Sequence, residues 1–152
     1  MGKAAKQVVT YCIRNDIGTL IVGYNTTFQR SSDLGRQMNQ VFVGISFGIL
    51  RRKLKYLCEM NGIRYVEQEE SYTSMASFWD LDEMPVYGEA GFVPPVFSGR
   101  RICRGLYQDR SGRRINADVN GALNIMRKCN IVSLRALYDR GDVDTPVRIR
   151  IA

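Results

Sequence analysis

Asp118 lies one residue into a predicted helix, in the stretch RRINADVNGALNIMRK (113–128), and asparagines stand at positions 116, 120 and 124 around it. Two interpretations compete. Short polar residues can cap a helix by accepting from its first N–H groups, and an acid there interacts favourably with the helix dipole. Alternatively, Asp118 could bind a metal ion, because Mg²⁺ prefers oxygen ligands. A metal site would require further carboxylates from other elements of the chain, whereas a helix cap would not.

The residue types in the chain restrict its chemistry. There is no histidine, which excludes Ser-His and Cys-His catalysis and most zinc chemistry. The four cysteines lie far apart, without a CxxC pair, and are predicted to be buried thiols. Any catalysis must therefore use carboxylates. The two candidates are Glu70, which follows a predicted buried strand, and Asp118.

Charge is divided between two segments of this chain of 152 residues with a net charge of +7. Residues 67–89 hold seven acids and no Lys or Arg, whereas residues 98–114 hold six arginines against the single acid Asp109. This pattern favours a surface that binds a polyanion beside a site that holds cations. Scattered charge on a soluble surface is the alternative. The arginines, which are the candidate nucleic-acid ligands, are Arg100, Arg101, Arg104, Arg110, Arg113 and Arg114.

The first third of the chain alternates helices and strands. Residues 3–14 predict a helix whose inner face holds Ala5, Val8 or Val9, and Cys12. TLIVGY (19–24) is a short apolar run without polar alternation, which is typical of a strand covered on both faces.

Residues 25–40 are polar and show no clear element. Ser46 is predicted to cap a second helix that ends near Met60, with Phe47, Leu50, Leu54 and Leu57 on its inner face, and IRYVE (63–67) predicts the next strand. This order predicts an α/β fold with two adjacent parallel strands.

Residues 69–114 break this alternation and predict an insertion of loops, with a hairpin that turns at Asp109–Gly112. A third helix is expected from Asn116 as its cap to about Lys128. Its inner face is predicted to hold Val119, Ala122, Leu123 and Met126, with the asparagines either on the surface or supporting a site. VRIRI (147–151) alternates like a half-exposed strand.

ESYTSMASF (70–78) followed by INADVNGALNI (115–125) resembles the C-terminal half of the transposon-encoded OrfB/TnpB family, over the chain from its first helix to about Lys128. Members of that family are RuvC-like nucleases with an RNase H-like fold, which cleave phosphodiesters with divalent metals. The resemblance implies that Asp118 binds a catalytic Mg²⁺ and that Asn120 supports the site or the nucleic acid. It also implies DNA, and guide-type RNA in full-length members, as partners.

The chain departs from the family pattern at several positions. The strand TLIVGY lacks the usual catalytic Glu, and Glu70, or Glu69 as the fallback, matches a variant that carries this residue just before the TS motif. The zinc-ribbon cysteines would fall at Ser77 and Asp80, and only Cys103 remains near the second pair, so no structural zinc is expected. The family's first catalytic Asp and first three strands would lie ahead of Met1. We therefore expect a partial RNase H-like fold over residues 1–130, the insertion at 69–114, and a C-terminal tail at 131–152.

These observations leave three functions open. They are a metal-dependent DNA nuclease, a nuclease-dead nucleic-acid-binding module, and a structural remnant of a transposon gene. Because two carboxylates cannot hold the metal pair, the isolated chain is expected to be inactive.

The edge of the 19–24 strand, without its expected neighbour, predicts a homodimer through Thr19–Tyr24, with the tail strand as the alternative occupant. No run is long and apolar enough for a membrane span and no signal peptide is evident, so a cytoplasmic location is expected.

Overall fold

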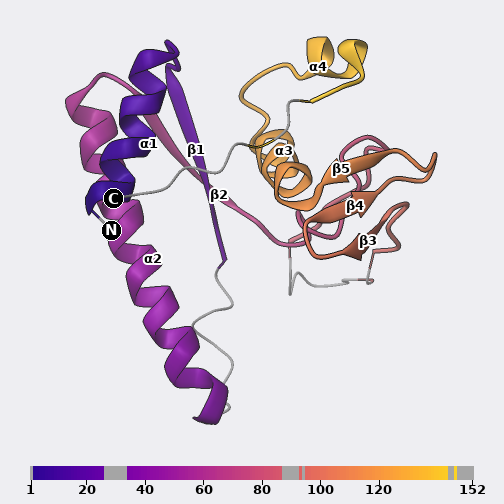
Figure 1. Cartoon of the computed structure of the whole chain (residues 1–152), viewed down its shortest axis with the longest axis horizontal. Coiled ribbons are helices and arrows are strands. Elements are labelled where there is room, and N and C mark those ends of the chain that lie inside the picture. The colour runs from indigo at the N-terminus through magenta and orange to yellow at the C-terminus, as the bar shows by residue number, and fades with distance from the viewer. Residues whose placement is uncertain (1, 26–33, 87–92, 94, 144–145, 147–152) are drawn as a thin grey trace. The chain divides into compact units, whose positions relative to one another are not determined.

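The computed structural model describes residues 2–25, 34–86, 93, 95–143 and 146, and the side chains of the second helix from residue 46 onward. The fold is mixed α/β, as predicted, and divides between Glu67 and Gln68 into two compact units (Figure 1). We call the part up to Glu67 unit 1 and the part from Gln68 to residue 146 unit 2. Within the described ranges, no helix is long and apolar enough to cross a membrane.

Unit 1 contains α1 (Gly2–Arg14), β1 (Thr19–Tyr24), α2 (Leu34–Met60) and most of β2 (Arg64–Glu69). The two helices pack together, and the strands lie beside them (Figure 1). The core is apolar and is formed by Ala5, Val9, Cys12, Leu54, Cys58 and Ile63, with Leu20 and Val22 of β1 packed against it. The predicted inner face of the first helix is therefore confirmed with Val9, because Val8 is exposed.

The second helix differs from its prediction. It begins at Leu34, twelve residues before the predicted cap at Ser46, so the expectation that residues 25–40 hold no element was wrong from residue 34 onward. Leu54 is buried as predicted, but Phe47 is exposed, and Cys58 is part of the core instead. A polar sequence such as that of residues 34–40 gives little periodic signal for a helix start.

The two strands of unit 1 pair with each other in parallel, as the alternation of helix and strand predicted. β2 runs one residue later than expected and extends to Glu69. A hydrogen bond of 2.9 Å from the Arg64 N–H to the Gly18 carbonyl lies at the start of this pairing. β2 ends next to the predicted site residue Glu70.

Unit 2 is built on an antiparallel sheet of three strands in the order β3-β4-β5, formed by β3 (Arg100–Cys103), β4 (Leu106–Gln108) and β5 (Arg114–Asn116). β4 and β5 form the hairpin predicted to turn at Asp109–Gly112. β3 was not predicted and adds a strand to what was expected to be loop. Gly99 just before it is required sterically, because a Cβ there would lie 2.6 Å from the Gln108 carbonyl oxygen.

Helix α3 (Ala117–Cys129) follows β5 directly and packs against the sheet (Figure 1). Its cap at Asn116 and its end near Lys128 were predicted correctly. Its inner face was predicted only in part. Val119 and Leu123 pack on the core around Tyr107 and Ile115, but Ala122 is exposed, and Asn120 and Asn124 are completely buried.

The chain after α3 forms a short helix, α4 (Arg135–Arg140). Tyr138 of α4 stacks on Phe78 with a ring-centroid distance of 4.8 Å, so this part of the predicted tail packs on unit 2. The predicted strand at 147–151 lies outside the described residues. The proposed domain boundary near residue 130 stays a prediction.

Candidate nucleic-acid interface

The start of α3 is capped by Asn116. Its side-chain oxygen accepts hydrogen bonds from the Asp118 N–H (2.9 Å) and the Val119 N–H (3.1 Å), which satisfies two of the N–H groups that a helix start leaves unpaired. The side chain of Asp118 is exposed in the first turn. Capping therefore accounts for Asn116, and Asp118 remains available for a ligand at the surface.

The other predicted acids lie where β2 ends. Glu69 forms an ion pair with Lys128 of α3 at 2.6 Å, and both side chains are largely buried. Burial alone would raise the pKa of Glu69, but the hydrogen bonds from Lys128 and Ser71 outweigh it, and the pKa lies below its usual value. Lys128 also donates to the carbonyl oxygens of Ser71 and Pro85. Glu69 thus attaches the loop to the helix.

Glu70 begins the loop that carries the YTS motif. Its carbonyl oxygen accepts from the N–H and the hydroxyl of Thr73, at 3.2 and 2.9 Å, which holds the loop in a tight turn. Within the described part of the chain, no group of three or more His, Cys, Asp or Glu side chains is arranged to hold a metal ion. Among the described side chains, the predicted acids Glu70 and Asp118 are therefore not joined by a third ligand of this kind.

The buried side-chain amides of Asn120 and Asn124 connect α3 to this loop by hydrogen bonds to its backbone. The side chain of Asn120 accepts from the Phe78 N–H (3.1 Å) and donates to the Ala76 carbonyl (2.9 Å). Asn124, one turn later, donates to the carbonyl oxygens of Thr73 and Ala76. Asn120 was predicted to support the site or the nucleic acid. The structure places its whole side chain in the interior, where it holds the loop.

Three aspartates of the loop and the hairpin accept hydrogen bonds from backbone N–H groups, and the bond of Asp80 connects the loop to the hairpin. Asp82 accepts from the N–H groups of Ser77 and Ser98, Asp80 from that of Arg110, and Asp109 from that of Arg113. Burial and the negative charges of these acids raise the pKa of nearby Tyr107 to about 12. The loop at Ser77 and Asp80 is thus held by carboxylates.

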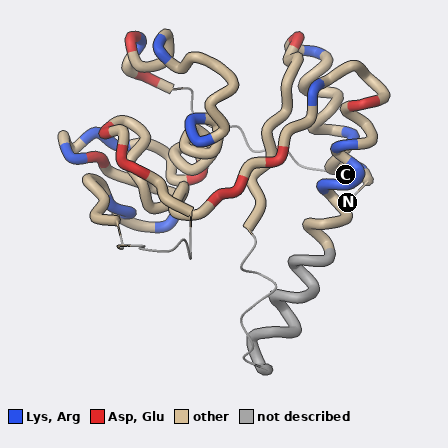
Figure 2. The backbone as a smooth tube through the Cα atoms, turned by 180° about the vertical axis from the view of Figure 1, so that it is seen from behind, with Lys and Arg blue, Asp and Glu red and all other residues tan. Residues whose placement is uncertain are grey.

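The sheet presents arginines on its outer face. Tyr107 of β4 and Ile115 of β5 pair with each other and are buried, so the residues next to them in each strand point away from the core. Arg100, Gln108 and Arg114 occupy this outer position and are paired across the three strands. We call them the arginine row. Arg100 and Arg114 are exposed, and Figure 2 shows the basic residues of this sheet in blue.

The remaining predicted arginines differ in their contacts. Arg101 and Arg104 are exposed at the β3 edge. Arg110 donates to the Ser98 hydroxyl at 2.8 Å, and the Arg113 guanidinium lies 4.7 Å from the centre of the Trp79 ring. Arg110 and Arg113 therefore have a part in the fold in addition to any ligand contact.

Residues 47–125 match the model of the Cas12f1-like TNB domain. The chain belongs to this family. The match includes both sequence motifs, YTS and DVNGALNI, and so confirms the predicted resemblance at the level of a family related to TnpB and Cas12. No curated protein sequence matches the chain.

In this member of the Cas12f1-like TNB family, the matched range contains the contacts between the 70–82 loop, the hairpin and the first two turns of α3, but not those of Lys128. It includes the buried amides, the three aspartates and the arginine row. The contacts of Asp82 and of the two buried amides with the loop backbone were not predicted from the sequence. The one signal for the amides was their spacing of four, which places Asn116, Asn120 and Asn124 on one face of a helix.

Proposed function

We propose that unit 2 binds DNA through the outer face of its three-stranded sheet, with the arginine row at the centre of the contact. The observation that carries this proposal is the alignment of Arg100, Gln108 and Arg114 across three neighbouring strands. Strands in a sheet lie about 4.8 Å apart, so the backbones at Arg100 and Arg114 are about 10 Å apart. Two exposed guanidinium groups at that spacing can contact separate phosphates of one strand.

The surroundings of the row support the same ligand. Arg101 follows Arg100 in β3 and Arg104 lies in the turn between β3 and β4, and both are exposed, so they add positive charge close to the row. Asp80, Asp82 and Asp109 accept hydrogen bonds from backbone N–H groups, and the ion pair of Asp109 is with Arg113, which is not part of the row. Membership of the Cas12f1-like TNB family agrees with a nucleic-acid ligand. A guide-type RNA would be a ligand of a longer protein by the same phosphate chemistry.

The test measures how binding of a labelled DNA oligonucleotide depends on salt, by fluorescence anisotropy. Each phosphate contact adds about 0.7 to 0.9 to the slope of log affinity against log salt concentration. The double variant Arg100→Gln/Arg114→Gln should therefore lower the slope by about 1.4 to 1.8 and weaken binding most at low salt. A double variant with an unchanged slope would refute the proposal.

The matched control changes the same charge elsewhere. Arg52 and Lys55 are exposed residues of α2 in unit 1, and Arg52→Gln/Lys55→Gln removes two positive charges without touching the sheet. Its slope should equal that of the unchanged chain. An equal fall in both variants would mean that net charge, and not the arginine row, governs binding.

We also propose that the isolated chain does not hydrolyse DNA. In-line hydrolysis of the RuvC type uses two metal ions held by several carboxylates. Here Glu69 is paired with Lys128, which leaves Glu70 and Asp118 as the acids predicted to hold Mg²⁺. Cleavage of DNA with Mg²⁺ or Mn²⁺ that disappears in Asp118→Ala would contradict this proposal.

The partner proposed for unit 1 is a second copy of the chain. In the described residues β1 pairs with β2 alone, so among them its other edge has no strand partner for its N–H and C=O groups. Such an edge is a template for strand pairing, and two copies could pair there through Thr19–Tyr24 about a two-fold axis. A monomer in light scattering, together with slow amide exchange at residues 21–23, would instead assign this edge to the tail strand.

A further inference from the structure

A cavity of about 390 Å³ opens in unit 2 between the start of α3 and the chain that follows α4. This volume is within the range of about 300–1,000 Å³ typical of sites for small ligands. Its walls combine one aromatic ring, two guanidinium groups, polar side chains and an apolar surface. The lining includes Trp79, Arg113, Arg114, Asn116, Asp142 and Val143.

Trp79 is held in a fixed orientation by two other rings. Phe78 and Tyr138 stack on each other, and each meets the indole edge-on, at centroid distances of 5.2 and 5.9 Å. An aromatic side chain that is oriented before a ligand arrives loses little conformational entropy on binding. The indole therefore has a fixed position in the wall of the cavity.

Arg113 adds a second planar group beside the indole. Its guanidinium lies over the Trp79 ring, forms an ion pair with Asp109 at 3.8 Å and donates to the Gly141 carbonyl at 3.4 Å. The Arg113 side chain is still 47% exposed, so part of the group faces solvent. Planar guanidinium and indole groups both stack on flat aromatic ligands.

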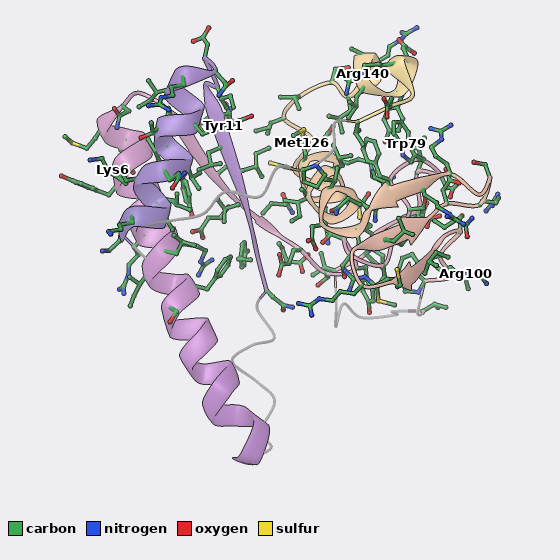
Figure 3. The ribbon with its side chains drawn as sticks, viewed as in Figure 1. Lys6, Tyr11, Trp79, Arg100, Met126 and Arg140 are labelled. Carbon is green, nitrogen blue, oxygen red and sulfur yellow. The ribbon has the colours of Figure 1, made fainter. Side chains whose placement is uncertain are left out.

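The cavity is continuous with the proposed DNA surface. Arg114 lines the cavity and is also the β5 member of the arginine row. Figure 3 shows Trp79 towards the β5 edge of the sheet and Arg100 at the β3 edge. A DNA strand whose phosphates contact the row would therefore pass the mouth of the cavity.

We propose that this cavity binds one unpaired base of a DNA strand held by the arginine row. A base has flat faces that stack on indole and guanidinium groups, and polar edges that suit Asn116 and Asp142. The buried Ile115 and the partly buried Val119 and Val143 supply the apolar part of the wall. The inference rests on the proposed function, since it adds base recognition to phosphate binding by the same unit.

The test uses Trp79 as its own reporter, because it is the single tryptophan of the chain. The full chain is titrated with a short oligodeoxythymidylate and with an abasic deoxyribose–phosphate oligomer of equal length. Stacking of a base on the indole should give saturable quenching of its fluorescence with the first oligomer and none with the second. Both oligomers should bind in an anisotropy assay, because both carry phosphates.

The outcomes separate the two proposals. If both oligomers bind but neither changes the fluorescence, or both change it equally, the cavity does not take a base, and phosphate binding by the row still stands. If neither oligomer binds, the proposed function itself is wrong, and the inference falls with it.

A variant measures the contribution of stacking independently. Trp79→Leu should weaken binding of the thymidylate oligomer by about 5- to 100-fold and leave binding of the abasic oligomer unchanged. Trp79→Phe, which keeps an aromatic face, should restore part of this loss. Equal affinity of the chain and Trp79→Leu for the thymidylate oligomer would overturn the inference. Should Trp79→Leu fail to fold, the quenching comparison on the unchanged chain still decides.

Discussion

In unit 1 the buried side chains of the described residues are apolar or thiols, whereas unit 2 completely buries two amides and a hydroxyl. The core of unit 1 is formed by Ala5, Val9, Cys12, Leu54, Cys58 and Ile63. Unit 2 has a smaller apolar core around Tyr107, Ile115 and Ala117, and its buried polar residues are Thr73, Ser77, Asp109, Asn120 and Asn124.

The two units are therefore stabilised differently, unit 1 by apolar burial and unit 2 in part by buried hydrogen bonds. Apolar burial is proportional to area and is not directional, so unit 1 needs only the right spacing of apolar residues. Hydrogen bonds are directional, and a buried group that loses its partner is costly. In the loop of unit 2 at residues 70–82, Phe78 is buried but Met75 and Leu81 are exposed, and the loop is also positioned by side chains that bind its backbone. The two units should therefore respond differently to equivalent substitutions.

The largest effect is expected from truncating the core of unit 1. Leu54 is 5% exposed, and Leu54→Ala should reduce the free energy of unfolding of unit 1 by about 2–5 kcal/mol through lost burial and a cavity. The measurement is chemical denaturation with hydrogen exchange read at the amides of α1 and α2. Leu81, which is 57% exposed in unit 2, is the matched control, and Leu81→Ala should change stability by about 0.5 kcal/mol or less. Similar effects of the two changes would show that unit 1 does not depend on its apolar core.

The second effect tests the polar interior of unit 2. Asn120→Leu keeps the approximate size of the side chain but leaves the Phe78 N–H without its partner, and it removes one of two donors to the Ala76 carbonyl. The expected loss is about 2–4 kcal/mol, seen as faster exchange at residues 73–78. The control is Asn61→Leu in unit 1, where an exposed amide donates to the Leu57 carbonyl, and about 1 kcal/mol or less should be lost. If Asn120→Leu were neutral, the amides would not be what positions the loop.

The elements of unit 1 could largely be predicted from sequence because their apolar residues follow the helix and strand periods. α1, β1 and the parallel pairing with β2 were predicted on this basis. The start of α2 could not, since residues 34–40 are polar and show no periodic signal. In unit 2, the hairpin and the Asn116 cap were predictable because turns and caps have local sequence rules.

The arrangement inside unit 2 was less predictable. Asn120, Asn124 and Asp82 have polar side chains, and such residues are usually on the surface, so nothing local indicates that they bind backbone groups more than ten residues away. The strand β3 lies among residues rich in glycine and arginine, where its pairing with β4 depends on the tertiary fold. The two motifs, by contrast, were sufficient to predict the family, and they lie in the 70–82 loop and at the start of α3.

The smallest effect should appear in the pH dependence of unit 2. Burial by itself would raise the pKa of Asp82, but the hydrogen bonds from Ser98 and Ser77 and the charge of Arg127 more than offset it, so the pKa lies below its usual value. A lowered pKa in the folded state stabilises the fold above the unfolded value of about 3.9, and this stabilisation is lost as pH falls through the folded pKa. At pH 7, Asp82→Asn should be about 1 kcal/mol less stable than the unchanged chain, because its amide oxygen can still accept but without the charge.

This stability difference should begin to shrink near pH ~4, where the unfolded carboxyl becomes protonated, and should approach zero as the pH falls through the lower pKa of the folded state. Denaturation at a series of pH values, monitored at the amides of the 77–82 loop, measures it. Asp139→Asn is the control, because Asp139 is exposed on α4 and its ion pair with Arg135, at 3.8 Å, is also exposed. That change should have almost no effect at any pH, since exposed ion pairs contribute little. A difference for Asp82→Asn that stayed constant with pH would mean that the shape of the side chain, and not the charge of Asp82, holds the loop to Ser98.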